Sequence, residues 1–216
     1  KPVMVDFYNH MKDNTWLKKF SYRVDPSSYF IKKERRHEYP SFELKKSGDP
    51  SVNLDIVFIP EGYTAAEMDK FRADCARLGD FLIQCKPFDE YRDKINISGV
   101  LAPSQESGAD SPGKDIWKRT ILNSSFYTFD IDRYLTTMDM KSVRDVAANV
   151  PYDQICIVAN SKVYGGGGIY NHYALFTSDN AYANYVFVHE FGHAFAGLGD
   201  EYYNSEVAYE DIYNLK

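Results

Sequence analysis

The sequence predicts an α/β (α+β) fold, in which helices flank a mixed, twisted sheet and part of a β-rich module precedes it. Two observations favour this class. Residues 54–101 carry strand, helix and strand signals in succession, as a crossover connection within one sheet does. Two more apolar runs, 155–159 and 170–176, come before a helix with an apolar stripe at helical spacing.

The first fifty residues alternate polar and aromatic positions, as at Phe20 and Tyr22. A period of two is typical of strands that bury one face. The Gly-Asp-Pro sequence at 48–50 is a turn signal and marks a boundary. We therefore expect residues 1–50 to be the end of a β-rich accessory module and residues 51–216 to form the main domain.

Residues 54–59 are a short run of apolar and β-branched side chains, which predicts a strand that ends before Pro60. Thr64 and Glu67 have the spacing of a capping box, so we expect a helix to begin there. An apolar stripe follows at helical spacing, and the helix is expected to stop before Pro87.

The middle of the chain supplies the remaining elements. A second strand is expected over 95–101, one or two helices over 131–150, and an apolar, central strand over 155–159. The run at 170–176 predicts the last strand, which would lead directly into a helix that carries two histidines.

Residues 189–193 have the H-E-x-x-H pattern of zinc hydrolases. Residues four apart lie on one face of a helix, so His189 and His193 can present both imidazoles to a single ion. Glu190 is rotated by about 100° from His189, which suits a general base better than a ligand. Because the pattern also occurs by chance on ordinary amphipathic helices, the residues around it decide how much it means.

Those surroundings favour a metal site. Apolar residues recur along one side of the helix, namely Phe187, Phe191, Phe195 and Leu198. Such a stripe indicates a helix that is pinned to a core. Gly197 and Gly199 then break the helix, because glycine tolerates the left-handed conformation at a C-terminus. Asp200 and Glu201 follow at once, where a turning chain could return a third ligand to the ion.

The segment H-E-F-G-H-A-F-A-G-L-G-D-E-Y, residues 189–202, resembles the signature of the bacterial IgA-peptidase family of zinc metallopeptidases. The resemblance continues through F-I-P-E-G-Y at 58–63 and A-P-S-Q-E-S-G-A-D at 102–110, so it covers roughly residues 50–204. It implies a secreted or surface-attached endopeptidase with a metzincin-like active-site helix. Residues 51–216 are then expected to be the zinc metallopeptidase domain.

The resemblance also implies one catalytic zinc ion, with both histidines as ligands and Glu190 as the catalytic base. The metzincin pattern places its last ligand three residues after a glycine. Asp200 keeps this interval from Gly197, so we favour Asp200 as the third ligand, with Glu201 as the alternative.

Four consecutive glycines, residues 165–168, come before the last predicted strand. No Lys-Ser or Lys-Thr pair follows them, so they are not a phosphate-binding loop; they let a backbone approach closely or a rim loop hinge. In metzincin-type endopeptidases an edge strand at this place pairs with an extended substrate. The residues expected to contact substrate are Gly167, Gly168, Tyr170 and His172.

The composition limits the kinds of partner. A formal net charge of −6 argues against nucleic acid, and no apolar run reaches the ~18 residues that a membrane-spanning helix needs. We expect a protein or peptide substrate, and the sequence leaves the oligomeric state open. No signal-peptide pattern is present, so a secreted, periplasmic or cell-surface location rests on the resemblance. The three cysteines form no C-x-x-C pair and are expected to be buried free thiols, with a disulfide formed after a chain turn as the alternative.

Several alternatives stay open. The loop at 104–113, with Glu106 and Asp110, is either solvated or a calcium site, although its spacing is not that of an EF-hand. The zinc site could serve an amidase or deacetylase acting on non-peptide substrates, or be vestigial in a catalytically silent surface binding module. No methionine follows His193, so either the family has no Met-turn or the catalytic domain continues beyond residue 216.

Overall fold

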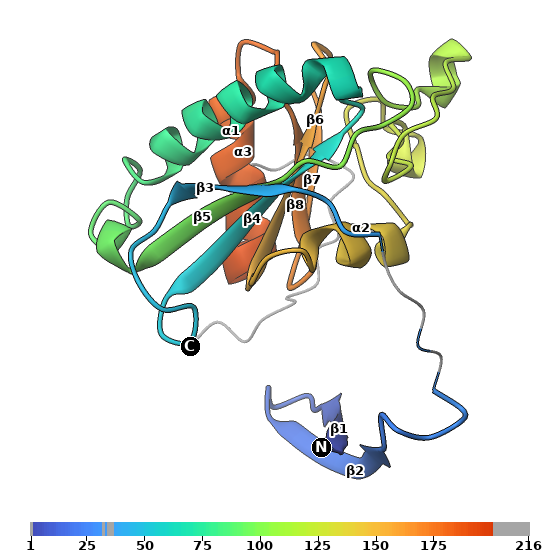
Figure 1. Cartoon of the computed structure of the whole chain (residues 1–216), viewed down its shortest axis with the longest axis vertical. Helices are drawn as coiled ribbons and strands as arrows, with labels where there is room; N and C mark the ends of the chain where they lie inside the picture. Colours follow the sequence, from blue (N-terminus) through green and yellow to red (C-terminus); the bar gives the residue numbers. More distant parts are fainter. Residues whose placement is uncertain (1, 32, 34–36, 201–216) are drawn as a thin grey trace. The chain divides into compact units, whose positions relative to one another are not determined.

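The structure, a computed structural model, describes residues 2–31, 33 and 37–200 (Figure 1). The chain divides into two compact units, residues 1–36 and 37–216. The predicted boundary after residue 50 falls inside the second unit, because a strand formed by residues 41–45 belongs to the sheet of that unit.

The first unit is an antiparallel hairpin of β1 (Val3–His10) and β2 (Trp16–Val24). Its register shifts between Phe7 and Tyr8, where a β-bulge interrupts the ladder. The rings of Phe7 and Phe20 stack with 4.3 Å between their centroids, but most large apolar side chains of the hairpin are exposed. The hairpin confirms the β-rich character predicted for the N-terminal module.

The second unit is built on a six-stranded mixed sheet in the order β3-β5-β4-β6-β8-β7. The strands are β3 (Ser41–Lys45), β4 (Leu54–Glu61), β5 (Ile95–Val100), β6 (Gln154–Ala159), β7 (Gly166–Ile169) and β8 (Tyr173–Thr177). The four inner strands are parallel, and β3 and β7 run antiparallel to their neighbours at the two edges. This arrangement confirms the predicted mixed sheet.

Strand β4 is longer than predicted, because it continues through Pro60 to Glu61. Proline lacks the N–H that a central ladder needs. Here the pairing of β4 with β5 ends at Phe58 opposite Gly99. The carbonyl of Glu61 accepts from Asn160 on the β6 side, so the alternation of the ladder turns the nitrogen of Pro60 toward the side where pairing has already ended.

Helices cover both faces of the sheet. The longer ones are α1 (Met68–Leu82), α2 (Met140–Ala147) and α3 (Ala183–Phe191), and α3 continues into the π-helical turn η5 (Gly192–Ala196). Short 3₁₀ turns are η1 (Ala65–Glu67), η2 (Arg92–Lys94), η3 (Pro112–Lys114) and η4 (Thr128–Asp130). Figure 1 places α1 and α2 on opposite sides of the sheet. None of the helices in the described residues is long and apolar enough to cross a bilayer.

Two local predictions had different outcomes. The capping box is present, because the backbone N–H and the hydroxyl of Thr64 both donate to the Glu67 carboxylate, at 2.9 and 2.8 Å. The helical prediction for residues 131–150 was wrong in its first half. Helix α2 begins only after Asp139, whose side chain accepts from the N–H of Ser142.

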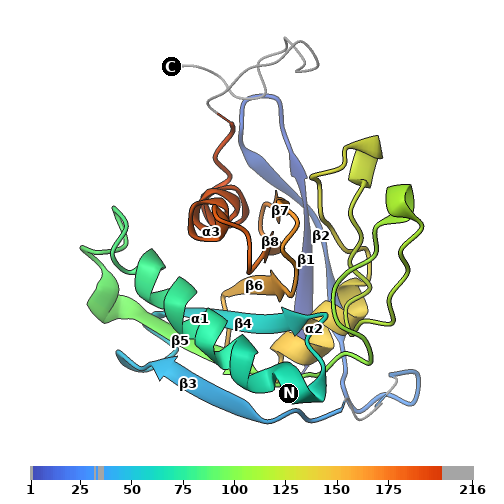
Figure 2. The same cartoon turned by 90° about the horizontal axis from the view of Figure 1, so that it is seen from above.

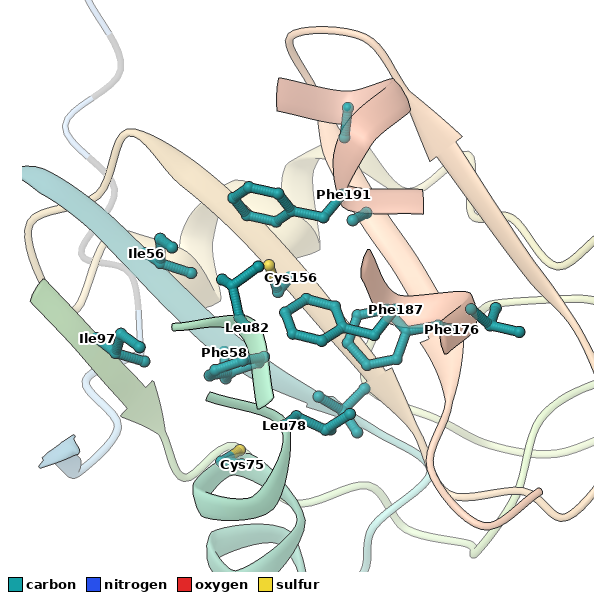
Figure 3. Close-up of a cluster of buried hydrophobic side chains, with 14 of the residues drawn as sticks. Ile56, Phe58, Cys75, Leu78, Leu82, Ile97, Cys156, Phe176, Phe187 and Phe191 are labelled. Carbon is teal, nitrogen blue, oxygen red and sulfur yellow. The ribbon is translucent and has the colours of Figure 1, made fainter. Parts of the chain in front are cut away.

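The alternation of β4 side chains creates a core on each face of the sheet. Ile56 and Phe58 pack with α1 and α3, whereas Val57 and Ile59 pack with α2. Figure 3 shows the first core, in which the ring of Phe187 from α3 lies among strand residues. Its centroid is 5.6 Å from that of Phe58, and this aromatic packing holds α3 against the sheet.

The three cysteines are free, as predicted. Cys75 and Cys156 are fully buried, and burial raises the pKa of both thiols. Cys85 is only partly buried.

The edge strand next to α3 differs from the prediction. The expected strand 170–176 begins only at Tyr173, as β8, and lies inside the sheet between β6 and β7. Residues 170–172 form the turn of a hairpin, in which Asn171 has a φ of 58°. The glycine run itself supplies the edge strand, β7, and Figure 2 shows α3 end-on beside β7 and β8.

Candidate active site

The H-E-x-x-H residues lie where α3 passes into η5. Phe187 and Phe191 are fully buried beneath this helix. The apolar stripe was predicted to extend further, but Phe195 is 42% exposed and Leu198 is 62% exposed. Ala194 is still fully buried, but residues 195–200 are exposed apart from the partly buried Gly197.

Three ligand-type atoms converge at the end of this helix. The Nε2 atoms of His189 and His193 are 3.0 Å apart, and each lies 3.2 Å from Oδ1 of Asp200. The side chains are partly buried, with 27%, 19% and 35% of their surfaces exposed. One carboxylate oxygen therefore faces both imidazoles, and the group remains open to solvent on one side.

The π-helical turn explains how Asp200 reaches the histidines. A π-turn accommodates one more residue than an α-turn, which delays the helix break to Gly197, one position later than the glycine of the metzincin pattern. Gly197 has a φ of +65° and turns the chain back. This agrees with the sequence, in which Gly197 and Asp200 each lie one residue later than the corresponding positions of the metzincin pattern and keep the pattern's interval of three residues.

The ring of His193 is held by the backbone. Its Nδ1 faces the carbonyl of Leu198 at hydrogen-bonding distance. A carbonyl can only accept, so Nδ1 carries the proton and Nε2 presents its lone pair toward Asp200 and His189. Metal-binding histidines are commonly oriented in this way, by donating the other ring N–H to a backbone carbonyl or a carboxylate.

His189 lies beside an aromatic ring. Tyr185, one turn earlier on the same face of α3, stacks at a centroid distance of 6.2 Å and an interplanar angle of 17°. Burial lowers the pKa of His189, and the neighbouring His193 adds to this effect. Both favour the neutral imidazole that binds a metal.

Glu190 lies against the glycines of β7. A Cβ atom at Gly166 would come within 2.9 Å of its Cγ and Oε1, and one at Gly168 within 2.4 Å of its backbone oxygen. Only glycine lets the edge strand approach the helix this closely. Burial is the main reason that the pKa of Glu190 rises to about 7, a value suited to a group that takes up and releases a proton near neutral pH.

The other side of β7 is covered by residues 133–136. The N–H of Gly166 donates to the carbonyl of Arg133 at 3.2 Å, and the N–H of Leu135 donates to the carbonyl of Gly166 at 3.1 Å. A Cβ atom at Gly167 would lie 2.6 Å from the carbonyl oxygen of Leu135. The outer edge of β7 is therefore already paired at its first residue, and its C-terminal half lies next to the histidines.

Two clefts meet at His189 and Glu190, and both also include Tyr134 and Gly166. The first, here called the arginine cleft, has a volume of about 360 Å³. Its further lining residues are Arg133, Tyr164, Tyr185 and Val186. The second, here called the glycine cleft, has a volume of about 390 Å³ and extends along β7 toward Gly197 and Asp200.

Three of the four residues predicted to contact substrate line a cleft, and the fourth does not. Gly167, Gly168 and Tyr170 line the glycine cleft. His172 lines neither cleft and is exposed in the turn between β7 and β8. Its position two residues after Tyr170 did not indicate this, because the hairpin turn falls between residues 170 and 172. The alternative ligand Glu201 lies outside the described residues.

The loop considered for calcium uses its carboxylates locally. Glu106 accepts from the N–H of Arg119, and Asp110 accepts from the N–H of Lys118. Across the described residues, His189, His193 and Asp200 are the one group of three or more side chains placed to hold a metal ion.

Some lining residues were missed by sequence reasoning. Tyr185 could have been found, because it lies four residues before His189 on the same helical face. Arg133, Tyr134 and Tyr164 carry no such local signal. Arg133 and Tyr134 reach the site through the backbone pairing of residues 133–135 with Gly166, a tertiary contact, and Tyr164 lies shortly before β7.

The three converging atoms fit a zinc ion. Zinc binds histidine nitrogen and carboxylate oxygen at roughly 2.0–2.2 Å, so neighbouring ligand atoms in a tetrahedral site lie about 3.3 Å apart. The separations of 3.0, 3.2 and 3.2 Å among His189, His193 and Asp200 form a nearly equilateral triangle of this size. Two imidazoles and one carboxylate are also a donor set that zinc accepts in hydrolytic enzymes.

A comparison with family models identifies a relationship over most of the chain. The model described as IgA Peptidase M64 matches residues 42–216, a longer stretch than the resemblance visible at residues 50–204. The match spans both clefts and the three converging side chains. No curated protein gives a significant match to the sequence.

Proposed function

Since the chain belongs to the IgA peptidase M64 family, a family of metallopeptidases, we propose that it is a zinc-dependent endopeptidase that hydrolyses peptide bonds of extracellular proteins. The observation that carries this proposal is the triangle of His189, His193 and Asp200 with Glu190 beside it. The extracellular setting follows from the resemblance stated above and is part of the proposal.

In this proposal His189, His193 and Asp200 hold one zinc ion. When bound there, zinc supplies Lewis-acid chemistry, which polarises a carbonyl and makes water more acidic. The chain orients the ligands itself: Leu198 fixes the tautomer of His193 through its carbonyl, and Gly197 fixes the turn that presents Asp200.

Glu190 acts as the general base. It takes a proton from the attacking water and passes it to the nitrogen of the leaving amine, so no net proton is consumed by the residue. Its buried position against Gly166 and Gly168 supports this role, because burial brings its pKa to about 7. A carboxylate in open water, with a pKa of about 4.3, would be a weaker base toward that water.

The substrate is proposed to bind as an extended peptide across the two clefts. Gly167, Gly168 and Tyr170 contact it on one side of the histidines, in the glycine cleft. Because Gly166 is already paired with residues 133–135, backbone pairing with the peptide is assigned to the C-terminal half of β7. His172 is not assigned a contact, since it lies outside both clefts.

The test is metal analysis joined to cleavage-site mapping by mass spectrometry on a denatured protein library. Glu190→Gln should retain zinc and lose cleavage by at least about 100-fold, the lower end of what general-base catalysis contributes. Glu90→Gln is the matched control, since Glu90 lies on the surface with 61% of its side chain exposed. Cleavage that persists in Glu190→Gln would refute the mechanism. Hydrolysis of small acetylated amides without any peptide cleavage would instead establish the amidase or deacetylase alternative.

A further inference from the structure

The arginine cleft differs in charge from the rest of the site. Arg133 is the one lysine or arginine among its lining residues in the described part of the chain. The glycine cleft, by contrast, has no lysine or arginine among its described lining residues and includes Asp200. A substrate lying across both clefts therefore meets a fixed positive charge on one side of the histidines only.

The backbone of Arg133 has a defined position. Its carbonyl accepts from the N–H of Gly166, and the next residue, Tyr134, is bridged to Gly166 in a parallel sense. The arginine is thus anchored directly to the strand that packs on Glu190. The backbone of Arg133 is therefore set beside Gly166, and its side chain starts from this point.

The guanidinium of Arg133 is available for a ligand. It lies over the ring of Tyr134 at 5.4 Å from the centroid. Among the described residues no aspartate or glutamate lies within ion-pair distance of Arg133. Guanidinium groups present a planar set of donors that matches a carboxylate, and stacking on an aromatic ring leaves these in-plane donors free.

The walls of the cleft strengthen such an interaction. Tyr134, Tyr164 and Tyr185 contribute flat rings with hydroxyl groups. Aromatic walls lower the local dielectric constant and increase the attraction between opposite charges, while phenol hydroxyls can donate to a carboxylate. Glu190 lines the same cleft, and Arg133 is the cationic side chain among the described lining residues that can pair with a substrate carboxylate.

We propose that the arginine cleft is a subsite for a substrate carboxylate, namely an aspartate or glutamate side chain near the cleaved bond, and that Arg133 determines this specificity. The inference rests on the proposed endopeptidase function, because the cleft opens from His189 and Glu190. It adds a substrate class to that function: peptides with an acidic residue at one defined position beside the scissile bond.

The first test uses pairs of internally quenched peptides built around a mapped cleavage site, which differ only by Glu or Gln at one position. The zinc-loaded full chain should prefer Glu at one position next to the scissile bond, by about five- to tenfold in kcat/KM, the size of a charge-assisted hydrogen bond at a partly solvated site. Arg133→Glu should remove this ratio or invert it in favour of Gln. Because the ratio is taken within each variant, a general loss of activity cancels.

Arg144→Glu is the matched control. Arg144 is exposed on α2 and lines neither cleft. Its replacement by glutamate changes the net charge by the same amount as Arg133→Glu. Its Glu-to-Gln ratio should equal that of the unaltered chain. An equal ratio in Arg133→Glu and the unaltered chain, or a ratio near one at every position, would overturn the proposal.

A second arm separates two sources of carboxylate. The same peptides are compared with a free and with an amidated C-terminus. The proposal expects amidation to leave the Glu-to-Gln ratio unchanged. If amidation abolishes cleavage while Glu and Gln are equivalent, the proposal fails and the cleft binds a terminal carboxylate instead.

A binding measurement distinguishes failure of this inference from failure of the proposed function. Fluorescein-labelled Glu and Gln peptides are titrated with the Glu190→Gln chain, with and without Arg133→Glu, and followed by fluorescence anisotropy. The Glu peptide should bind several-fold more tightly, and Arg133→Glu should abolish the difference. If the unaltered chain cleaves no peptide but this difference is found, the endopeptidase function fails and the subsite stands. If peptides are cleaved and no difference is found, the subsite fails and the function stands.

Discussion

A Cβ atom placed on Gly168 would lie 2.4 Å from the backbone carbonyl oxygen of Glu190 and 2.8 Å from Cβ of His193. The edge strand β7 therefore touches the backbone of the active-site helix at the residues proposed for catalysis and metal binding. Any side chain at this glycine has to push the strand and the helix apart.

We expect Gly168→Ala to destabilise the protein by about 1–3 kcal/mol, the usual cost of overpacking, and to reduce peptide cleavage more than tenfold. Urea unfolding and kcat/KM measure the two effects. Gly199→Ala is the control for stability, because a Cβ atom there meets nothing within 4 Å. If both alanine variants unfold at the same urea concentration, the close packing of β7 on α3 is not as described.

The second prediction concerns Asp200. Asp200→Asn removes the charge from the proposed third ligand. Loss of a group that only hydrogen-bonds to a ligand lowers metal affinity by roughly 10–100-fold, so zinc affinity should fall by more than this. Competition with a chelator measures the affinity. Glu201→Gln tests the alternative ligand in the same assay. A large loss with Glu201→Gln and none with Asp200→Asn would reverse the assignment.

The third prediction concerns the turn at Gly197. Its φ of +65° is left-handed, and a Cβ atom there would also lie 3.1 Å from the ring of Tyr170. Gly197→Ala should cost about 1–2 kcal/mol, since side chains disfavour this conformation, and should weaken zinc binding because Asp200 follows three residues later. Gly197→Asn should cost less, because asparagine tolerates the left-handed region. Thermal unfolding and chelator competition measure the loss of stability and of zinc affinity in both variants. Equal losses of stability in Gly197→Ala and Gly197→Asn would contradict this prediction.

The fourth prediction is a dependence of stability on pH through Glu67. Its carboxylate accepts from Thr64, Ser107 and Asn160. Partial burial acts to raise the pKa of Glu67, but these hydrogen bonds outweigh it and the pKa is lowered from 4.5. A lowered folded-state pKa stabilises the protein above the unfolded pKa, and this contribution disappears as the pH falls through the folded value.

Glu67→Gln should therefore destabilise by about 1–2 kcal/mol at pH 7, as expected for lost charge-assisted hydrogen bonds. The difference from the unaltered chain should stay constant down to about pH 6 and shrink below the ordinary glutamate pKa of about 4.3. Urea unfolding at several pH values measures it. Glu90→Gln, on an exposed surface pair, should show little effect at any pH. A difference for Glu67→Gln that grows as the pH falls would contradict the direction of the shift.

The parts of the fold that depend on near neighbours were predicted well. The capping box of Thr64 and Glu67 and the strand around 54–59 are set by residues a few positions apart, and the structure contains both. The predicted helix over 131–139 was wrong, because these residues pair with other segments instead, as at Ser125 and Thr136. Propensity gives way where tertiary hydrogen bonds offer the backbone other partners.

In the candidate site, too, local features were predictable from the sequence and long-range contacts were not. By itself the sequence determined that His189 and His193 share one helical face with Glu190 beside them, because a spacing of four residues has one geometric meaning on a helix. Only the tertiary structure decided that the glycine strand β7 forms the sheet edge, that His172 lines neither cleft, and that Arg133 lies beside Gly166. The order of strands and the docking of loops depend on contacts between residues far apart in the chain, and no local periodicity encodes those.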